Sequence, residues 1–230
     1  MQFIHRHQII LLLLVATVTG VVAQPNKEQY DNKWIHFGFS LTTNSASLRV
    51  DANTTYFQKD SLRNVNQSSF PGIGLGALTN FRLGKSFDIR VMLPQISFTQ
   101  RNLTYTFDGS TKVVKIESAY CDGSLLLKYK SARRRNIRAY VIGGFRASYD
   151  LASTQKQNRS INSPVVSLIP FTYGYEGGFG LDIYFPYFKF SPELKFCNTI
   201  NNGMFRDGYL YTDAIQKITP QMVMFSLHFE

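Results

Sequence analysis

The sequence predicts an all-β fold: an eight-stranded antiparallel transmembrane β-barrel of the outer-membrane type, preceded by a cleaved signal peptide. Three observations predict it, namely a signal-peptide pattern, long segments of alternating apolar and polar residues, and connections that alternate between long and short. The length of 230 residues fits one domain or at most two. We expect the signal peptide at residues 1–23 and a single barrel domain at residues 24–230.

The N-terminal segment carries the signal-peptide pattern. Arg6 precedes an apolar run that begins at Ile9, and the run closes with small residues around Ala23. This order of a cation, an apolar stretch and a small-residue cleavage site is typical of a secretory signal. An uncleaved anchor helix is the alternative, but the segment from Ile9 to Val22 is shorter than the roughly 20 residues that span a membrane as a helix.

Alternation is clearest at residues 171–185. Odd positions from Phe171 to Phe185 are apolar or aromatic except Gly177, whereas even positions are small or polar except Tyr184. Such a stretch is longer than an ordinary soluble strand and long enough to cross a bilayer, which takes roughly 9–11 tilted residues. The same pattern occupies 34–43. Further strands are predicted at 70–83, 86–99, 113–130, 138–150, 187–197 and 220–229, which completes a set of eight.

The predicted connections alternate in length. The long ones are 44–69, 100–112, 151–170 and 198–219, and the short ones are 84–85, 131–137 and 186. Long extracellular loops and tight periplasmic turns are typical of bacterial outer-membrane barrels, and an even strand number then leaves both termini in the periplasm. A soluble lipid-binding barrel fits less well, because its apolar face would point inward.

The composition excludes other classes of protein. Hydrophobic residues make up 44% and charged residues 17% of the chain, so the composition of a disordered protein is absent. The formal net charge of +10 would ordinarily suggest nucleic acid as a partner. Export from the cytoplasm removes that interpretation, and we expect no nucleic-acid partner.

Charges of both signs fall on the inward face of the predicted strands. Because an eight-stranded barrel has room for little more than side chains, these charges are expected to pair in a structural network that fills the lumen. The predicted network consists of Arg82, Asp88, Arg90, Arg146, Glu176, Asp182, Lys189, Glu193 and Lys195. A filled lumen disfavours a transport channel, and we expect neither a cofactor nor a small-molecule ligand.

A cluster of cations surrounds the third short connection. Its members are Lys128, Lys130, Arg133, Arg134, Arg135 and Arg138. One interpretation is a periplasmic docking site for an acidic partner or for lipid phosphates, with arginine as the forked donor. The alternative is that these side chains only reach toward the membrane surface.

The cysteines and histidines give little sign of chemistry. Cys121 and Cys197 fall on non-neighbouring strands and opposite faces, which disfavours a disulfide bond. His36 and His228 fall on the inward face near the ends of the first and last strands. One interpretation is a pH-sensitive or metal-binding pair, and the other is two ordinary polar residues of the lumen. Neither histidine has a recognisable Ser or Cys nucleophile beside it, so we predict that the protein is not an enzyme. We also expect no metal site, because the mature chain has only these two histidines to join the two cysteines as ligands.

Two blocks of sequence carry a family resemblance. They are Lys128-Tyr129-Lys130-Ser131 with the following Arg133 to Gly144, and Gly178 to Tyr184 continuing through Tyr187 to Phe196. With His36-Phe37-Gly38, Phe70 to Gly76 and the final Phe225 to Glu230, the chain resembles the PorT (SprT) family of outer-membrane barrels. Cys121-Asp122-Gly123-Ser124 departs from the expected pattern, which leaves the register of the fourth strand open.

The resemblance implies a function without catalysis. It implies an accessory component of the type IX secretion system, which exports cargo with C-terminal sorting domains and serves gliding motility, with outer-membrane lipid and other type IX components as partners. The alternative is a free-standing structural or adhesive barrel that binds through its loops at 44–69, 151–170 and 198–219. The Arg133-Arg134-Arg135 run concentrates charge on the predicted periplasmic side and favours the secretion role.

Overall fold

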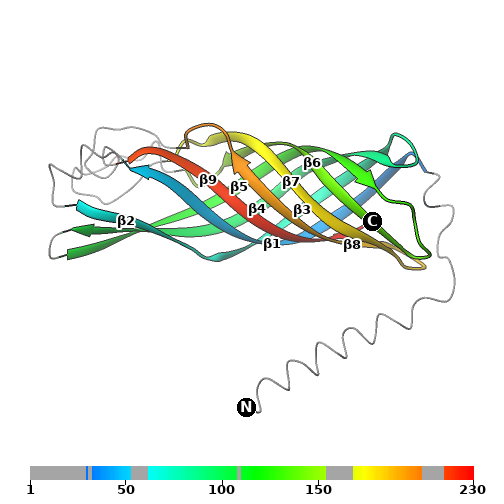
Figure 1. Ribbon diagram of the computed structural model, residues 1–230, viewed down its shortest axis with the longest axis horizontal. Helices are drawn as coiled ribbons and strands as arrows, with labels where there is room; N and C mark the ends of the chain where they lie inside the picture. Colours follow the sequence, from blue (N-terminus) through cyan, green and yellow to red (C-terminus); the bar gives the residue numbers. More distant parts are fainter. Residues whose placement is uncertain (1–29, 31–32, 53–61, 108–109, 154–167, 204–214) are drawn as a thin grey trace, which may run out of the picture.

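A computed structural model describes residues 30, 33–52, 62–107, 110–153, 168–203 and 215–230. Its strands form one antiparallel sheet that closes on itself into an elongated barrel (Figure 1). The strands are β1 (Ile35–Ala52), β2 (Leu62–Ser69), β3 (Pro71–Arg82), β4 (Phe87–Phe107), β5 (Ser110–Lys130), β6 (Ile137–Asp150), β7 (Phe171–Tyr184), β8 (Lys189–Thr199) and β9 (Ile215–Phe229). Within these residues, no helix has the length and apolar character needed to cross a membrane. The predicted signal peptide at 1–23 lies outside the described residues and stays a prediction.

β2 and β3 are two halves of one bent strand, so the barrel wall has eight strands. Both halves pair with β4, but the register changes by one residue between the pair Ser69 and Arg101 and the pair Ile73 and Phe98. The N–H of Phe70 still donates to the carbonyl of Gln100, at 3.2 Å. One extra residue in a continuous strand is a β-bulge. The predicted fold class is therefore confirmed.

The strands are strongly tilted. A path across the strands that starts at Ile35 on β1 passes through Phe81, Ile89, Leu127, Gly143, Gly177, Phe196 and Val223 and returns to β1 at Ser45. The path thus moves ten residues along β1, from position 35 to position 45, in one circuit. A stagger of this kind is what strand tilt requires when a sheet closes into a barrel.

Several predicted strand ends are wrong at the end of the barrel that carries the long connections. The segments 44–52 and 62–69 belong to β1 and β2 and not to a connection, and residues 100–107 and 110–112 belong to β4 and β5. β9 begins at Ile215, five residues before its predicted start at 220. Most outward residues there are polar, as at Thr104 and Lys115. The backbone continues as a strand, but the apolar–polar alternation that marks a bilayer-facing strand is lost.

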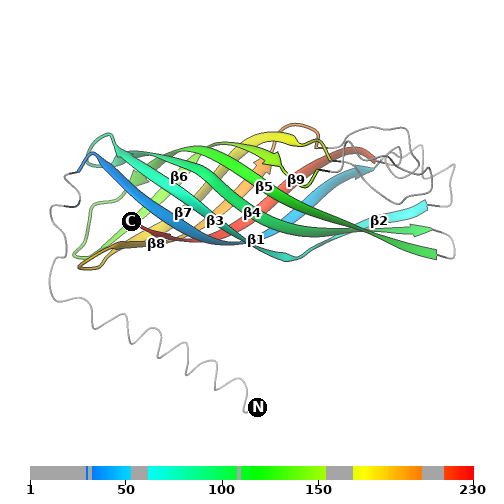
Figure 2. The same ribbon diagram turned by 180° about the vertical axis from the view of Figure 1, so that it is seen from behind.

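These longer strands form an extension beyond the rim of the barrel, which lies at Asp150, Phe171 and Thr199. We define the extension as 45–52 of β1, β2, 101–107 of β4, 110–118 of β5 and 215–221 of β9; Figure 2 shows β2 and the ends of β4 and β5 projecting together. Its inward side chains form an apolar core of Leu48, Leu103, Tyr105, Val114, Ile116 and Ile218.

The outer wall of the barrel proper is apolar. Large outward side chains such as Leu75, Phe179 and Leu181 are 44–62% exposed. Exposed aromatic residues lie at both ends of this wall, at Trp34, Phe87, Tyr129, Tyr187 and Phe188 near the short turns and at Tyr149, Phe171 and Tyr173 near the rim. An apolar band between two aromatic girdles is the surface that a bilayer requires.

Candidate functional site: the charged lumen and the arginine turn

The lumen near the short turns is centred on Glu193 of β8. Its carboxylate accepts hydrogen bonds from Arg90 Nη1 at 2.6 Å and from the Tyr140 hydroxyl at 2.7 Å. Arg90 also donates from Nε to Asn80 at 2.9 Å, and its Nη2 lies 3.5 Å from Glu230. Lys189 closes this group with a 2.7 Å ion pair to Glu230. The side chains of Arg90 and Glu193 are wholly buried, so each charge depends on the other for compensation.

A second group lies between β5 and β7. Lys128 Nζ contacts both carboxylate oxygens of Asp182 at 2.8 Å and lies 3.7 Å from the centre of the Tyr140 ring. The hydroxyl of Ser191 donates to the same carboxylate at 2.7 Å. Lys130 pairs with Asp88 at 2.6 Å. Tyr140 therefore joins this group to the one around Glu193.

Two further pairs lie closer to the rim. Lys195 pairs with Glu176 at 3.3 Å, and the Cys197 thiol donates to the same carboxylate at 3.3 Å. Arg146 pairs with Asp122 at 2.6 Å. With the pairs above, the shortest contacts match six cations with six carboxylates: Arg90, Lys128, Lys130, Arg146, Lys189 and Lys195 with Glu193, Asp182, Asp88, Asp122, Glu230 and Glu176.

The structure brings eight of the nine residues of the predicted network into these pairs. Arg82 is the exception, because its Nε donates to the carbonyl of Gly84 in the adjacent turn at 3.0 Å. Two further predictions need correction. Lys128 and Lys130, predicted as part of the cationic docking cluster, point into the lumen, where their relative exposures are 0% and 6%. Asp88, the partner of Lys130, lies on the neighbouring strand β4, and Asp182, the partner of Lys128, lies two strands away on β7; the run of cations in the sequence conceals both partners.

Three lumen residues were missed as network members. Asp122 lies in the segment where the family pattern breaks, and Glu230 lies beyond the last strand residue. Tyr140 lies within β6, and its sequence position predicts a strand residue but no link between charged groups. The irregular register near Asp122 lies on β4, between Met92 and Gln95, while β5 itself pairs regularly with β6.

The two histidines are not neighbours. His228 lies opposite Ser40 of β1, four residues along the strand from His36. The His228 Nε2 lies 3.2 Å from Glu193 and is completely buried, whereas the His36 ring stacks on Tyr30 with centroids 4.2 Å apart. Both cysteines are free thiols. Among the described residues, no group of three or more His, Cys, Asp or Glu side chains could hold a metal ion.

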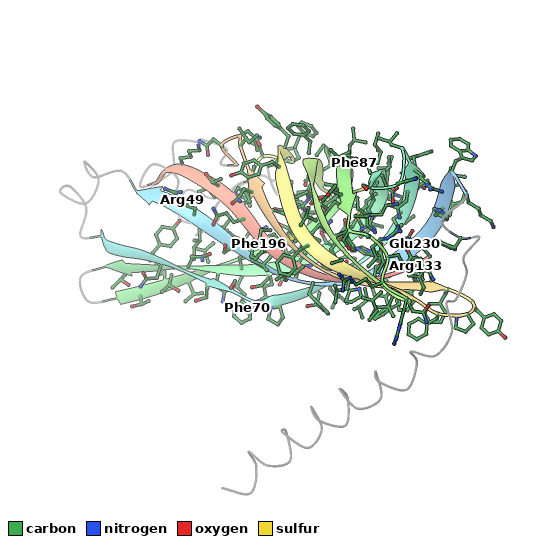
Figure 3. The ribbon with its side chains drawn as sticks, turned by 45° about the vertical axis from the view of Figure 1, so that its right-hand side comes forward. Arg49, Phe70, Phe87, Arg133, Phe196 and Glu230 are labelled. Atoms are coloured by element: carbon green, nitrogen blue, oxygen red, sulfur yellow. The ribbon has the colours of Figure 1, made fainter. Side chains whose placement is uncertain are left out.

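The turn between β5 and β6 carries the remaining cations and lies at the same end of the barrel as Glu230 (Figure 3). Arg134 and Ile137 exchange two backbone hydrogen bonds, which leaves Arg135 and Asn136 at the tip. Arg135 has a φ of 54°, a left-handed conformation that favours glycine. The Arg133 guanidinium stacks 3.8 Å above the Tyr184 ring. Arg134 and Arg135 are exposed, while Arg138 is half-buried; these arginines form what we call the arginine turn.

The interior holds apolar clusters as well as ion pairs, and one of these clusters, formed by Leu78, Met92, Leu126, Tyr140 and Ile142, lies among the ion pairs. Above the ion pairs lies a cluster of Ala46, Tyr120, Cys197, Met222 and Met224, and above it the core of the extension. A cavity between these levels has a volume of about 20 Å³, close to the space of one water molecule. The closed sheet, the apolar outer wall and the filled interior define a class of protein. This chain is a small outer-membrane barrel whose lumen is packed with side chains.

Comparison with known proteins places this class more exactly. Residues 22–203 match the family model described as outer membrane protein beta-barrel domain, and the chain belongs to this family. A search of curated proteins returned no match.

Three solved structures are similar in fold. OprG of Pseudomonas aeruginosa is 15% identical, with 85% of this chain and 93% of that chain covered and a TM-score of 0.48. Ail of Yersinia pestis is 11% identical, with 84% and 96% covered and a TM-score of 0.39. The N-terminal barrel of OprF from Pseudomonas aeruginosa is 12% identical, with 81% and 96% covered and a TM-score of 0.32.

Proposed function

We propose that this chain is a non-conducting outer-membrane barrel that acts by contact, as an accessory component of type IX protein secretion. The observation that carries the proposal is the filled lumen: six buried ion pairs occupy the space through which a pore would have to pass. A chain that passes nothing through itself acts through its surface. The type IX assignment is supported by the sequence resemblance to the PorT family, which extends over the predicted mature chain and implies export of cargo with C-terminal sorting domains and gliding motility.

The contact surface in this proposal is the arginine turn on the periplasmic side. Long connections lie at the opposite end of the barrel, which is the end that faces outward in barrels of this type. Arg134 and Arg135 are exposed in the arginine turn and present forked donors to an acidic partner or to lipid phosphates. Arg133 is held over Tyr184 and fixes the base of the turn.

The extension favours a second candidate function. Strands that continue past the rim and enclose their own apolar core form a rigid surface outside the bilayer. Such a surface suits a free-standing adhesive or structural barrel, whose binding residues would lie at the outer end.

Secretion in a strain that lacks this chain separates the two candidates. C-terminally sorted cargo is assayed by blot in the medium and in the periplasm. Cargo trapped in the periplasm with intact membranes supports the secretion role. Normal secretion overturns it and leaves the adhesive candidate.

The contact itself is tested with a double variant, Arg134→Ser with Arg135→Gly, which removes both exposed charges and leaves Arg133 on Tyr184. We expect a heat-modifiable, membrane-inserted barrel with lost export. Lys85→Ser is the matched control, because Lys85 is exposed in another turn at the same end. Normal export by the double variant, or equal loss by the control, would remove the docking role of the arginine turn.

A further inference from the structure

Arg101 of β4 is a buried cation outside the six ion pairs. Its relative exposure is 1%, and its Nη2 donates to the Ser118 hydroxyl at 2.8 Å and to the Tyr120 hydroxyl at 2.7 Å. The guanidinium carbon also lies 5.5 Å from the centre of the Tyr120 ring. Its Nε has no hydrogen-bond partner. None of these contacts supplies a negative charge.

No carboxylate among the described residues lies within ion-pair distance of Arg101. Asp122 is committed to Arg146 at 2.6 Å. Asp150 of β6 is buried and lies opposite Tyr120 of β5. Its Oδ1 accepts hydrogen bonds from the backbone N–H groups of Ala119 and Ala152. Burying a charge without a counter-charge is costly, so the position calls for an anion.

Arg101 is also one of the residues that line the cavity of about 20 Å³. Arg101 and Arg146 line it together with the hydroxyl-bearing residues Tyr120, Ser148 and Thr172. Its remaining lining includes apolar and sulfur-containing side chains such as Met222 and Cys197. A space of this size has room for about one water-sized occupant, which fits a monatomic anion better than sulfate, phosphate, a carboxylate or a lipid headgroup.

From these observations we infer that the cavity between Arg101 and Arg146 is a binding site for a single halide ion, chloride under ordinary conditions. The anion accepts from the unpartnered Nε of Arg101 and neutralises the buried guanidinium. A monovalent halide ion is compatible with a site of this kind, in which guanidinium and hydroxyl groups donate hydrogen bonds and apolar C–H groups complete the lining. The ion thereby joins the charged half of the lumen to the apolar core of the extension.

Thermal unfolding of the purified full chain in detergent tests the site. Chloride is exchanged for gluconate at constant ionic strength, and the fraction of heat-modified protein is followed on a gel. A ligand that binds only the folded state raises Tm as its concentration rises. We expect Tm to increase with chloride or bromide and not with gluconate, and an anomalous bromide peak in the cavity in crystals grown with sodium bromide.

Arg101→Met is the decisive variant, because an apolar side chain of similar length removes the need for an anion and is often tolerated at a buried ionic position. We expect it to fold and to lose the chloride dependence and the bromide peak. Lys115→Met, on the outward face of the neighbouring strand, is the control and should retain both. A chloride-independent Tm in the unaltered chain, or a cavity that holds only water in bromide crystals, would overturn the proposal.

Discussion

The lumen near the short turns and the interior of the extension are enclosed partly by the same strands, yet they are filled with different chemistry. β4 contributes Arg90 to the first region and Leu103 to the second. Outside the first region lies hydrocarbon, and outside the second lies water. Where the outer wall must be apolar, the inner face carries the polar residues, and where the outer wall is polar the inner face can form an ordinary apolar core.

This difference determines how each region should fail. An ion pair in the lumen has no solvent to replace a lost partner, so removal of one charge leaves the other buried and uncompensated. In the extension, truncation of an apolar side chain costs transfer free energy and leaves a cavity. The first kind of damage should therefore affect the whole barrel, and the second should stay local.

Glu193→Gln is expected to have the largest effect. It leaves Arg90 without its closest counter-charge, and loss of one member of a buried pair costs about 3–5 kcal/mol. The measurement is the temperature of heat modification of the purified barrel. Glu117→Gln, on an exposed outward position, is the control and should change little. An unchanged Tm for Glu193→Gln would mean that water compensates Arg90, and the contrast between the two regions would disappear.

Leu103→Ala should cause the next largest loss of stability, and this loss should be confined to the extension. Leu103 is completely buried, and such truncations cost about 2–5 kcal/mol. We expect faster protease cleavage in the extension, while the heat-modification temperature of the barrel stays near that of the unaltered chain. Val113→Ala, at an outward position that is 52% exposed, is the control. A matching fall in barrel stability would show that the two regions unfold as one unit.

Two adjacent glycines of β6 sharpen the comparison between the inner and outer faces. A Cβ at Gly144 would collide with the carbonyl of Leu125, whereas at Gly143 the nearest atom is 3.8 Å away. Gly144→Ala should destabilise the barrel by about 1–3 kcal/mol through overpacking, and Gly143→Ala should be nearly neutral. Heat modification of both variants on one gel is the measurement. Equal effects would mean that the inner wall has more room than the structure gives it.

Arg135→Gly should have the smallest effect on stability, and in the opposite direction. The left-handed conformation at Arg135 costs a non-glycine residue about 1 kcal/mol, which glycine does not incur. The heat-modification temperature should therefore rise slightly or stay the same. If docking depends on this charge, export falls in a barrel that is no less stable. A loss of stability would contradict the strained turn.

Much of this architecture could be predicted from the sequence because the bilayer imposes alternation. The inward residues Arg90, Asp182 and Glu193 follow directly from it, since each lies between outward apolar neighbours. The ends of β4 and β5 could not be predicted, because beyond the bilayer the outward positions are free to be polar. The apolar residues that alternate there, such as Leu103 and Ile116, point inward and give only a weak sequence signal for a strand.

Partners across the lumen were harder to predict than the inward face itself. Lys128 lies between the outward residues Leu127 and Tyr129, but it also belongs to a run of cations, and nothing in the sequence indicates that its partner is Asp182, two strands away on the sheet. Glu230 gives no alternation signal because it follows the last strand. Arg135 shows no sequence sign of its left-handed backbone, since the position would ordinarily be glycine.

The ion pairs of the lumen join residues that are far apart along the chain, and this has a consequence for assembly. The ion-paired residues Arg90 and Glu193 are 103 residues apart, and Asn80 and Glu230, which share a hydrogen bond, are 150 apart. A half-formed sheet lying in hydrocarbon would expose unpaired charges and open edges together, which the bilayer does not tolerate. We therefore expect insertion and closure to be a single cooperative event, so that pulse-proteolysis during refolding into vesicles reveals full-length protected barrel and no shorter protected intermediate.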